Sequence, residues 1–384
     1  MVRRQRCVPT GAGRGARVPW MDERKRLEEL RRQLTELDQE ILRSIERRAR
    51  IAHELAKLRT GTARFAPTAD AAHVQALERA VTPPFPQRAV RPIFVAIDAA
   101  SRAFEVAPRV AYLGAEGDYG WTAAHDHFGI GGEFVRADSP LAAIEEVARS
   151  RADFAVIPYE SLKEGPIFPT IQAIGGADLK VVGERQLVQA LDLVNRTGSL
   201  ADVERVYSSP QDHVACVNYL ELQHPRALVL DVRGPQAAWD LAAENEGSAA
   251  IVPRGFAGGQ ELRVARENVG DEGELRIRYA VLSRLPSPRS GHDATAILFS
   301  VHDRPGALHD ILQHFKERSC NLRRVHSRPV PGEGWDYVFY VEVSGHTTDR
   351  ALVAALEGVK RETKMLKIIG SFPLERPDPP HERA

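Results

Sequence analysis

Two arginines interrupt an apolar stripe near the N-terminus of the chain. Arg48 follows Ile41 by seven residues, which puts it on the apolar face of a helix, and Arg59 lies three turns further on almost the same face. Long basic side chains on such a face can carry their charged ends out to solvent. The alternative is that an anionic ligand lies inside the helical unit and supplies the missing charge, because an unpaired buried charge is costly.

Two further arginines flank an isoleucine in residues 274–282, which read E-L-R-I-R-Y-A-V-L. Alternation along a β-strand places Ile277 and Tyr279 on one face, and Arg276 and Arg278 on the other. In an ordinary sheet the arginines would be solvated and Ile277 would lie in the core. The remainder of the chain must decide between this interpretation and a functional one.

A third candidate is the turn of residues 114–120, which reads G-A-E-G-D-Y-G between an expected strand and an expected helix. Such a turn can present backbone N–H groups to an anion. Many turns of this type are rich in glycine for their geometry alone, so both interpretations remain open.

Composition limits the class of protein to which these residues belong. A chain of 384 residues predicts two or three domains, and its 52 basic and 52 acidic residues leave no net field that favours nucleic acid or an anionic membrane. No apolar run reaches the roughly 18 residues of a membrane helix. Cys7, Cys216 and Cys320 are far apart, which predicts a reducing cytoplasm and neither disulfide nor zinc framework.

The first 20 residues differ from the rest of the chain. They are rich in arginine and glycine, and the first acidic residue is Asp22. They contain no apolar middle of the kind that a signal peptide needs. We interpret residues 1–20 as a disordered extension or a misassigned start, with Met21 beginning the folded protein.

The next segment is helical. Apolar residues recur at steps of three and four from Leu27 to Leu55, which predicts one long helix over residues 22–60. Two shorter helices are expected at 70–80 and 90–105. A stripe of this length needs a partner to cover it, so we expect a dimer of interlocked helices.

The pattern changes at Arg109. Short apolar runs alternate with helical stretches to about Leu285, which predicts an α/β domain of two lobes around a cleft. After a linker at 287–293, the order strand, helix, strand, strand, helix, strand predicts a ferredoxin-like βαββαβ module.

Three units in this order resemble the bifunctional chorismate mutase/prephenate dehydratase family of phenylalanine biosynthesis. The resemblance implies an all-α chorismate mutase-like bundle at 21–107, a two-lobed prephenate dehydratase-like domain at 108–286, a regulatory ACT domain at 294–376 and a tail at 377–384. The ACT domain carries the most specific motifs, P-G-A-L at 305–308, S-R-P at 327–329 and a closing G-S-F-P. The resemblance implies chorismate and prephenate as substrates, neither cofactor nor metal, and an oligomer of at least two chains.

In the bundle, the resemblance implies a site that holds a dicarboxylate and stabilises charge on the breaking ether oxygen. Arg31, reaching across from the other protomer, and Arg48 match the carboxylate-binding arginines of the family, and Arg59 replaces a lysine. Ala69 stands where the family has a further arginine, which predicts weakened activity. The remaining matches are Asp70 in place of glutamate, Ser101 and Glu105.

The α/β domain departs further from the family pattern. The threonine whose hydroxyl assists loss of water from prephenate is Ile277, whereas the carboxylate-binding arginine is kept as Arg278. Glu-Asn-Ser becomes Glu160, Ser161 and Leu162. Other departures are Asp118 for threonine, Ser209 for histidine and Arg233-Gly234 for Ser-Thr. We therefore expect dehydration to be weakened or lost.

The ACT motifs imply a site for L-Phe or a related aromatic amino acid at a subunit interface. The residues implied are Gly306, Ala307, Leu308, Ser327 and Arg328. His326 replaces the acidic residue of the family, which leaves the identity of the effector open. A module that only dimerises is the alternative.

Three hypotheses about function follow. The chain is a phenylalanine-pathway enzyme under feedback, a prephenate decarboxylase that does not aromatise its substrate, or a non-catalytic relative that senses an aromatic amino acid. The products formed from chorismate distinguish the first two hypotheses, and ligand binding without turnover selects the third.

Overall fold

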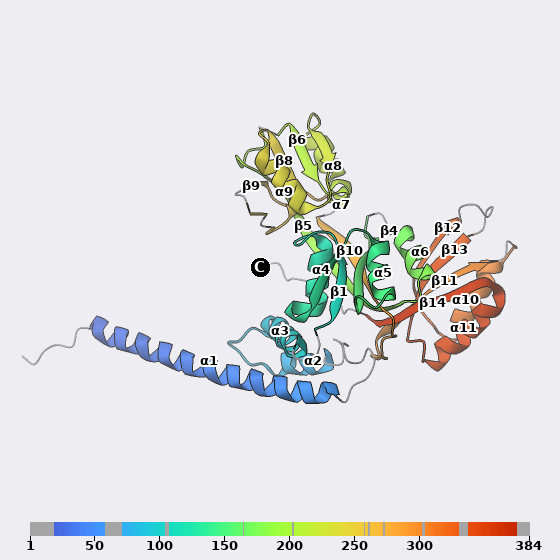
Figure 1. Cartoon of the computed structure of the whole chain (residues 1–384), viewed down its shortest axis with the longest axis horizontal. Coiled ribbons are helices and arrows are strands. Elements are labelled where there is room, and N and C mark those ends of the chain that lie inside the picture. The colour runs from blue at the N-terminus through green and yellow to red at the C-terminus, as the bar shows by residue number, and fades with distance from the viewer. Residues whose placement is uncertain are drawn as a thin grey trace, which may run out of the picture.

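The computed structural model describes residues 19–57, 71–103, 107–163, 165–201, 203–256, 258–259, 262–271, 273–301, 304–329 and 337–374. A helical unit, a two-lobed α/β domain and a C-terminal α/β module follow one another along the chain, as the sequence predicts (Figure 1).

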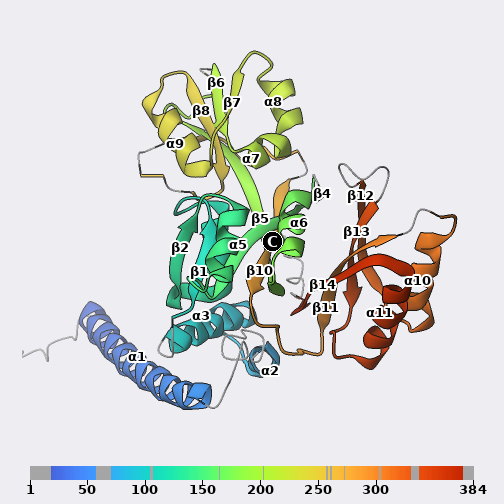
Figure 2. The same cartoon turned by 45° about the vertical axis from the view of Figure 1, so that its right-hand side comes forward.

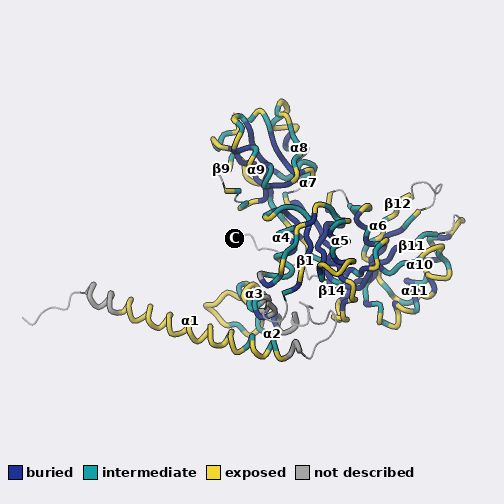
Figure 3. The backbone as a smooth tube through the Cα atoms, viewed as in Figure 1, coloured by how far each residue is buried: buried dark blue, intermediate teal, exposed yellow. Residues whose placement is uncertain are grey.

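The helical unit consists of α1 (Pro19–Lys57), α2 (Ala71–Ala80), the short η3 (Gln87–Ala89) and α3 (Val90–Ala103). The long helix begins three residues before the expected start, at a proline, whose fixed φ suits the first turn of a helix. The second half of α1 packs against α3. Much of the apolar stripe of α1 remains exposed in a single chain (Figure 3), including Leu27, Leu30, Leu34, Leu37 and Ile41.

The first lobe of the α/β domain contains β1 (Arg109–Leu113), β2 (Glu133–Ala137) and β3 (Phe154–Ser161). Its remaining elements are α4 (Tyr119–Phe128), η4 (Gly129–Gly131), α5 (Pro140–Ala148), β4 (Gly165–Pro166) and α6 (Phe168–Gly176). β1 pairs in parallel with both β2 and β3.

The second lobe contains β6 (Arg205–Ser208), β7 (Leu228–Asp231), β8 (Ser248–Pro253) and β9 (Arg263–Arg266). Its helices are α7 (Pro210–Ala215), α8 (Val217–Gln223) and α9 (Pro235–Glu244). β6 pairs in parallel with β7 and β8.

Two long strands connect the lobes. β5 (Lys180–Asn195) pairs with β10 (Glu274–Ser283) along its first part, and then with β8 and β9 of the second lobe. The strand order is β2-β1-β3-β10-β5-β8-β6-β7. β5 therefore runs from one lobe into the other (Figure 2).

The C-terminal domain contains β11 (Asp293–Val301), α10 (Ala307–Glu317) and β12 (Leu322–Pro329), followed by β13 (Tyr337–Ser344), α11 (Arg350–Glu362) and β14 (Thr363–Pro373). This is the predicted βαββαβ order. Its sheet runs β12-β13-β11-β14, so β12 is an edge strand.

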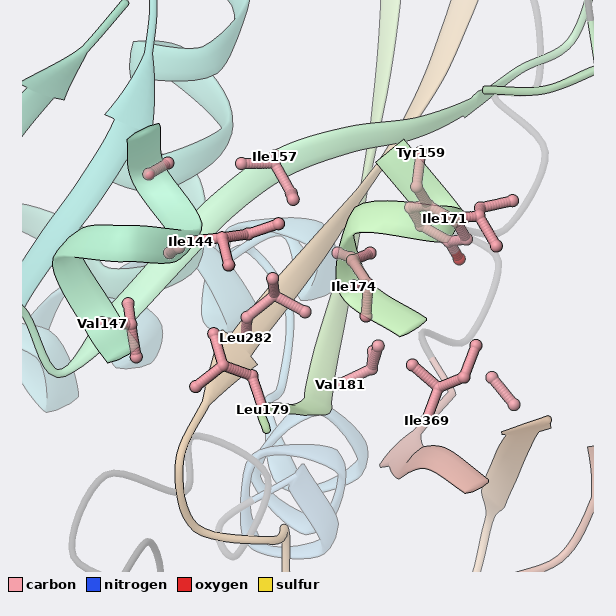
Figure 4. Packing of buried hydrophobic residues seen from close by; sticks show 14 of the residues in the cluster. Ile144, Val147, Ile157, Tyr159, Ile171, Ile174, Leu179, Val181, Leu282 and Ile369 are labelled. Atoms are coloured by element: carbon pink, nitrogen blue, oxygen red, sulfur yellow. The ribbon is translucent and has the colours of Figure 1, made fainter. Parts of the chain in front are cut away.

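One apolar cluster spans the α/β domain and the C-terminal domain. Ile157 and Leu282 of the first lobe belong to the same buried cluster as Ile369 of the C-terminal domain (Figure 4). The cluster also contains Tyr340 and Phe372 of the C-terminal domain. Burial of these large side chains stabilises the contact between the domains. A second cluster, which includes Ile277, Tyr279 and Tyr119, lies on the other face of β10 and extends into the second lobe.

Candidate functional site

The helical unit brings two of the implied mutase residues into direct contact. Arg48 of α1 donates a hydrogen bond from Nη1 to Oγ of Ser101 on α3, over 3.2 Å. The Ser101 hydroxyl in turn donates to the carbonyl oxygen of Ile97 over 2.7 Å. Ser101 is buried and Arg48 is half-buried. The guanidinium of Arg48 is thus held between two helices, where it can bind an anionic group.

Arg31 does not join this pair within one chain. It is exposed on α1, seventeen residues before Arg48 and thus about 25 Å away along the helix axis. The resemblance assigns it to the site of the other protomer, which this separation permits. Arg59, Asp70 and Glu105, together with the replaced position Ala69, lie outside the described residues.

In the α/β domain, Ile277 lies on the face of β10 that points toward the junction of the two lobes. It is 1% exposed, and it belongs to the same buried cluster as Tyr119, Tyr279 and Cys216. Its register partner on β3 is Ser161, which is also buried. Paired residues of neighbouring strands share a face, so Ser161 faces the same junction. Leu162, the next residue, is exposed.

Two buried carboxyl groups lie at this junction, one from each lobe. Asp118 ends the turn before α4, and Asp212 lies in the first turn of α7. Tyr119 of the first lobe donates a hydrogen bond to Oδ1 of Asp212 over 2.5 Å. The backbone N–H of Asp212 donates to Oγ of Ser209, which caps α7. The substituted positions of the 114–120 turn and of the segment before α7 are therefore neighbours in space.

The carboxyl group of Asp118 lies at the N-terminus of α9 in the opposite lobe. It accepts backbone hydrogen bonds from Ala115, over 2.7 Å, and from Gln236 of α9. A Cβ added to Gly234 would lie 2.6 Å from Oδ1 of Asp118. The departures Asp118 and Arg233-Gly234 are thus coupled, because only glycine leaves room for this close approach.

Burial changes the proton affinity of both acids. It raises the pKa of Asp212 to about 7, against the opposing effect of the hydrogen bonds from Tyr119 and Ser209. Burial likewise raises the pKa of Asp118, although backbone N–H groups of Ala115 and Gln236 counteract it. Within the described chain, Asp212 makes no ion pair, and neither Oδ2 of Asp212 nor Oδ1 of Asp118 has a hydrogen-bond partner.

Arg278 points away from this junction. Its side chain is 8% exposed and is held by the carboxylates of Glu160, Glu184 and Glu342. The guanidinium also lies over the ring of Tyr159, 4.7 Å from its centroid. A register shift between Arg278 and Tyr279 in the pairing of β10 with β3 places Arg278 opposite Glu160. Arg276, two residues earlier, is solvated with a side-chain exposure of 48%.

The Arg278 cluster crosses the boundary between two domains. Glu342 of β13 is fully buried and lies 3.1 Å from Nη1 of Arg278. Arg324 of β12 contacts Glu342 over 2.8 Å and Glu160 over 3.2 Å, and His326 lies 3.7 Å from Glu160. Burial alone would raise the pKa of Glu342, but Arg278 and Arg324 outweigh it and the pKa is lowered.

These contacts separate two residues that the resemblance assigns to one wall of the cleft. Ile277 faces the junction of the lobes, whereas Arg278 and Glu160 face the C-terminal domain. The donors of Arg278 are occupied by carboxylates of the protein itself. The described structure therefore gives Arg278 a bracing role between the two domains.

The implied effector residues lie in two places. Gly306 has a left-handed φ of 81° and precedes α10, whose first residues are Ala307 and Leu308. Ser327 and Arg328 lie on β12, and β13 separates this strand from β11. Arg328 lies over the ring of Phe168 on α6, 5.5 Å from its centroid. The two sets therefore belong to non-adjacent parts of one module.

Several of these residues were not anticipated from the sequence. Glu342 is the acidic residue of the apolar run Y-V-F-Y-V-E-V, and Glu184 precedes the arginine of a long strand. An acid at an inward strand position signals a buried cation partner. Asp212 follows Ser-Ser-Pro-Gln, in the first turn of a short helix, but nothing in the sequence pairs it with Tyr119.

Comparison with known proteins assigns the chain to a family. The family model of chorismate mutase type II matches residues 30–106, that of prephenate dehydratase matches 110–287, and that of the ACT domain matches 295–361. A bifunctional chorismate mutase/prephenate dehydratase of Aquifex aeolicus is 31% identical over 359 residues, covering 90% of this chain and 98% of its own. The chain belongs to the bifunctional chorismate mutase/prephenate dehydratase family.

Further relatives support the same assignment. A prephenate dehydratase of Corynebacterium glutamicum is 31% identical over 277 residues, which covers 70% of this chain and 88% of that protein. The crystal structure of a prephenate dehydratase from Arthrobacter aurescens in complex with L-Phe superposes with a TM-score of 0.61. It is 27% identical and covers 69% of this chain and 90% of that chain. Both catalytic domains of the bifunctional family and its ACT domain are therefore present.

The described residues contain neither a candidate membrane span nor a candidate metal site. No helix among them is both long and apolar enough to cross a bilayer. No group of three or more histidine, cysteine, aspartate or glutamate side chains among them could hold a metal ion.

Proposed function

We propose that this bifunctional enzyme converts chorismate to prephenate in its helical unit, converts prephenate to phenylpyruvate slowly in its α/β domain, and responds to an aromatic amino acid through its ACT domain. The observation that carries the proposal is the match to a bifunctional relative over 98% of that relative's length. The contact between Arg48 and Ser101 supports the first activity.

Three features support a slow second step. Ile277 offers no hydroxyl group at the position from which the family assists departure of water. The guanidinium of Arg278 is engaged by three glutamates on the opposite face of the sheet. Asp118 places a carboxyl group at the junction of the lobes where the family has a threonine, and an ionised carboxylate there repels a dianionic substrate.

Incubation of the full chain with chorismate, followed by NMR of the products, tests this proposal. We expect chorismate to disappear, prephenate to accumulate and phenylpyruvate to form slowly at neutral pH. A control without enzyme removes the contribution of spontaneous conversion. Absence of chorismate consumption, or phenylpyruvate formed as fast as prephenate, would contradict the proposal.

A non-aromatising prephenate decarboxylase is the second candidate. Ile277 favours this candidate, because it supplies no hydroxyl group to assist departure of the ring hydroxyl. Prephenate bound beside it can then lose carbon dioxide and keep its ring hydroxyl. A decarboxylated product that keeps its ring hydroxyl would support this candidate in the same NMR experiment.

The ACT domain is expected to bind L-Phe or a related aromatic amino acid. A ligand that binds only the folded state raises the melting temperature by mass action, by an amount that grows with its concentration. Replacing Gly306 with leucine is expected to abolish the shift. Gly291→Leu is the matched control, because Gly291 has a similar φ of 88° and nothing within 4 Å of an added Cβ. If no aromatic amino acid at millimolar concentration raises the melting temperature, the ACT domain has only a structural role.

We also propose that the enzyme is at least a homodimer and works in the cytoplasm. The exposed leucines of α1 form a stripe that a second copy of the helical unit would cover, and the two parts of the effector site are separated within one chain. Cys216 and Cys320 are free thiols, as in a reducing compartment. Light scattering at micromolar concentration is expected to give twice the chain mass or more, and a monomer would contradict the role of Arg31.

A further inference from the structure

The junction between the lobes contains an acid whose position suits the delivery of a proton. Asp212 belongs to α7 of the second lobe, and its Oδ1 is tied to Tyr119 of the first lobe. Ser209 caps α7 and fixes its first turn, because its Oγ accepts a hydrogen bond from the backbone N–H of Asp212. The side chain therefore has one defined orientation at the place where the two lobes meet.

The second oxygen of this carboxyl group lies outside hydrogen-bond geometry of the described residues. Oδ2 of Asp212 is buried and has no hydrogen-bond partner among the described residues. An ionised carboxylate would normally collect donors on both oxygens. A carboxylic acid with its proton on Oδ2 needs one acceptor there instead, which the hydroxyl group of a bound substrate can supply, while Oδ1 accepts from Tyr119.

The surroundings of Asp212 coincide with the positions where this chain departs from its family. Asp118 is close enough for its charge to affect Asp212, and Gly234 lies against Asp118. Ser209 replaces a histidine of the family motif and caps the helix that carries Asp212. Ile277 and Tyr279 line the same buried cluster as Tyr119. The lost hydroxyl and the additional acid thus occur at one junction.

We propose that Asp212 is the proton donor of the α/β domain, in place of the hydroxyl group that the family carries at position 277. This inference rests on the proposed function, namely that prephenate binds between the lobes. Since Oδ1 is engaged by Tyr119, Oδ2 is the oxygen of Asp212 that is left to meet a substrate bound between the lobes.

The step balances with prephenate as the only substrate. The proton on Oδ2 passes to the ring hydroxyl, whose C–O bond breaks with both electrons going to oxygen, so that water leaves. The bond between the ring and its carboxylate supplies the electron pair that completes the aromatic ring, and carbon dioxide leaves. Asp212 remains as a carboxylate and takes up a proton from solvent before the next turnover.

The pH dependence of this step follows from the groups that face Asp212. Burial raises the pKa of Asp212 to about 7, so that the donor form is lost as the pH rises through neutrality. Of the other groups, burial raises the pKa of the Tyr119 and Tyr279 phenols and of the Cys216 thiol still further from neutrality. Asp118, whose pKa is raised by burial, starts from an ordinary value of 3.8. His213 on the same helix faces Asp231 instead, 2.8 Å away.

The test compares phenylpyruvate formation from added prephenate by the unaltered chain and by Asp212→Asn. The asparagine keeps the size of the side chain and an acceptor for Tyr119, but it holds no acidic proton. We expect the rate to fall on the order of 10²–10⁴-fold, while chorismate consumption by the same preparation is unchanged. His213→Gln is the matched control, because it removes a titratable neighbour and is expected to leave both the rate and its pH profile intact.

A second variant provides a readout that loss of structure would not produce. The kcat/KM of the unaltered chain is expected to fall tenfold per pH unit above about 7. Tyr119→Phe removes a hydrogen bond that favours the ionised form, so the falling limb should move to higher pH. Equal turnover by Asp212→Asn would overturn the role of Asp212 alone. Absence of any turnover of prephenate by the unaltered chain would overturn both this role and the proposed dehydration, and a non-aromatic product would contradict donation to the hydroxyl group.

Discussion

Replacement of Arg278 by alanine is expected to lower the free energy of unfolding by about 3–5 kcal/mol at neutral pH, because it leaves buried carboxylates without their cation. Glu342 is fully buried, and the side chains of Glu160 and Glu184 are 15% and 9% exposed. Urea unfolding followed by circular dichroism measures the loss in the free energy of unfolding.

Arg276→Ala is the control for this experiment. Arg276 lies two residues earlier on the same strand, is half-exposed and, among the described residues, pairs with its neighbour Glu274 at 3.4 Å. Solvated pairs of this kind contribute little, so we expect a change within about 0.5 kcal/mol. Equal effects of the two replacements would refute the bracing role of Arg278.

The effect of Arg278→Ala should also depend on pH in a defined direction. The pKa of Glu342 is lowered in the folded state from an ordinary value of 4.5. A group of this kind contributes its stability above the unfolded pKa and loses it as the pH falls through the folded one. The difference in the free energy of unfolding between the unaltered chain and Arg278→Ala should therefore be largest at neutral pH and become smaller below about pH 4.5.

Replacement of Arg48 by alanine is expected to lower the kcat/KM for chorismate by about 10²–10³, the usual effect of removing one preorganised donor from an electrostatic site. Arg48 of α1 is fixed by the side chain of Ser101 on α3. A continuous assay of chorismate consumption measures the effect. Arg50→Ala is the control, because the side chain of Arg50 is 80% exposed and its contact among the described residues is a long one of 3.9 Å with Glu46 on its own helix.

A gain of activity can test the same site from the opposite direction. If the absence of an arginine at position 69 limits the rate, Ala69→Arg should raise the kcat/KM for chorismate. If Arg48→Ala and Ala69→Arg both leave chorismate consumption unchanged, the helical unit serves only assembly.

The order and type of the elements could be predicted from the sequence because hydrophobic periodicity reports them directly. The change from steps of three and four residues to short apolar runs at Arg109 separates the first two domains, and the βαββαβ order of the third is visible in the same way. Alternation along residues 274–282 predicted that Ile277 and Tyr279 share a face, and the structure confirms this.

The partners of Arg278 could not be predicted, because they are contributed by distant strands. Glu184 and Glu342 lie 94 and 64 residues from Arg278 in the sequence. Their meeting depends on the register of β10 with β5 and on the docking of the C-terminal domain, and no local pattern encodes either. The resemblance alone assigned Arg278 to the substrate, without indicating which side of the sheet it faces.

The junction of the lobes shows the same limit. The substitutions at Asp118, Ser209 and Gly234 were visible as separate departures from a family pattern. Only the fold shows that Asp118 reaches the N-terminus of α9, that Gly234 leaves room for it and that Asp212 meets Tyr119 beside them. The departures therefore describe one rebuilt junction rather than independent losses.

Phenylpyruvate formation by Ile277→Thr, compared with that of the unaltered chain on the same prephenate preparation, tests this conclusion most directly. Residues that act as a unit do not recover one at a time. We therefore predict that the restored hydroxyl alone leaves phenylpyruvate formation slow, because Asp118 and the engaged Arg278 are unchanged. A rise of several hundred-fold, to a rate that matches chorismate consumption, would show instead that one missing hydroxyl had limited an otherwise intact site.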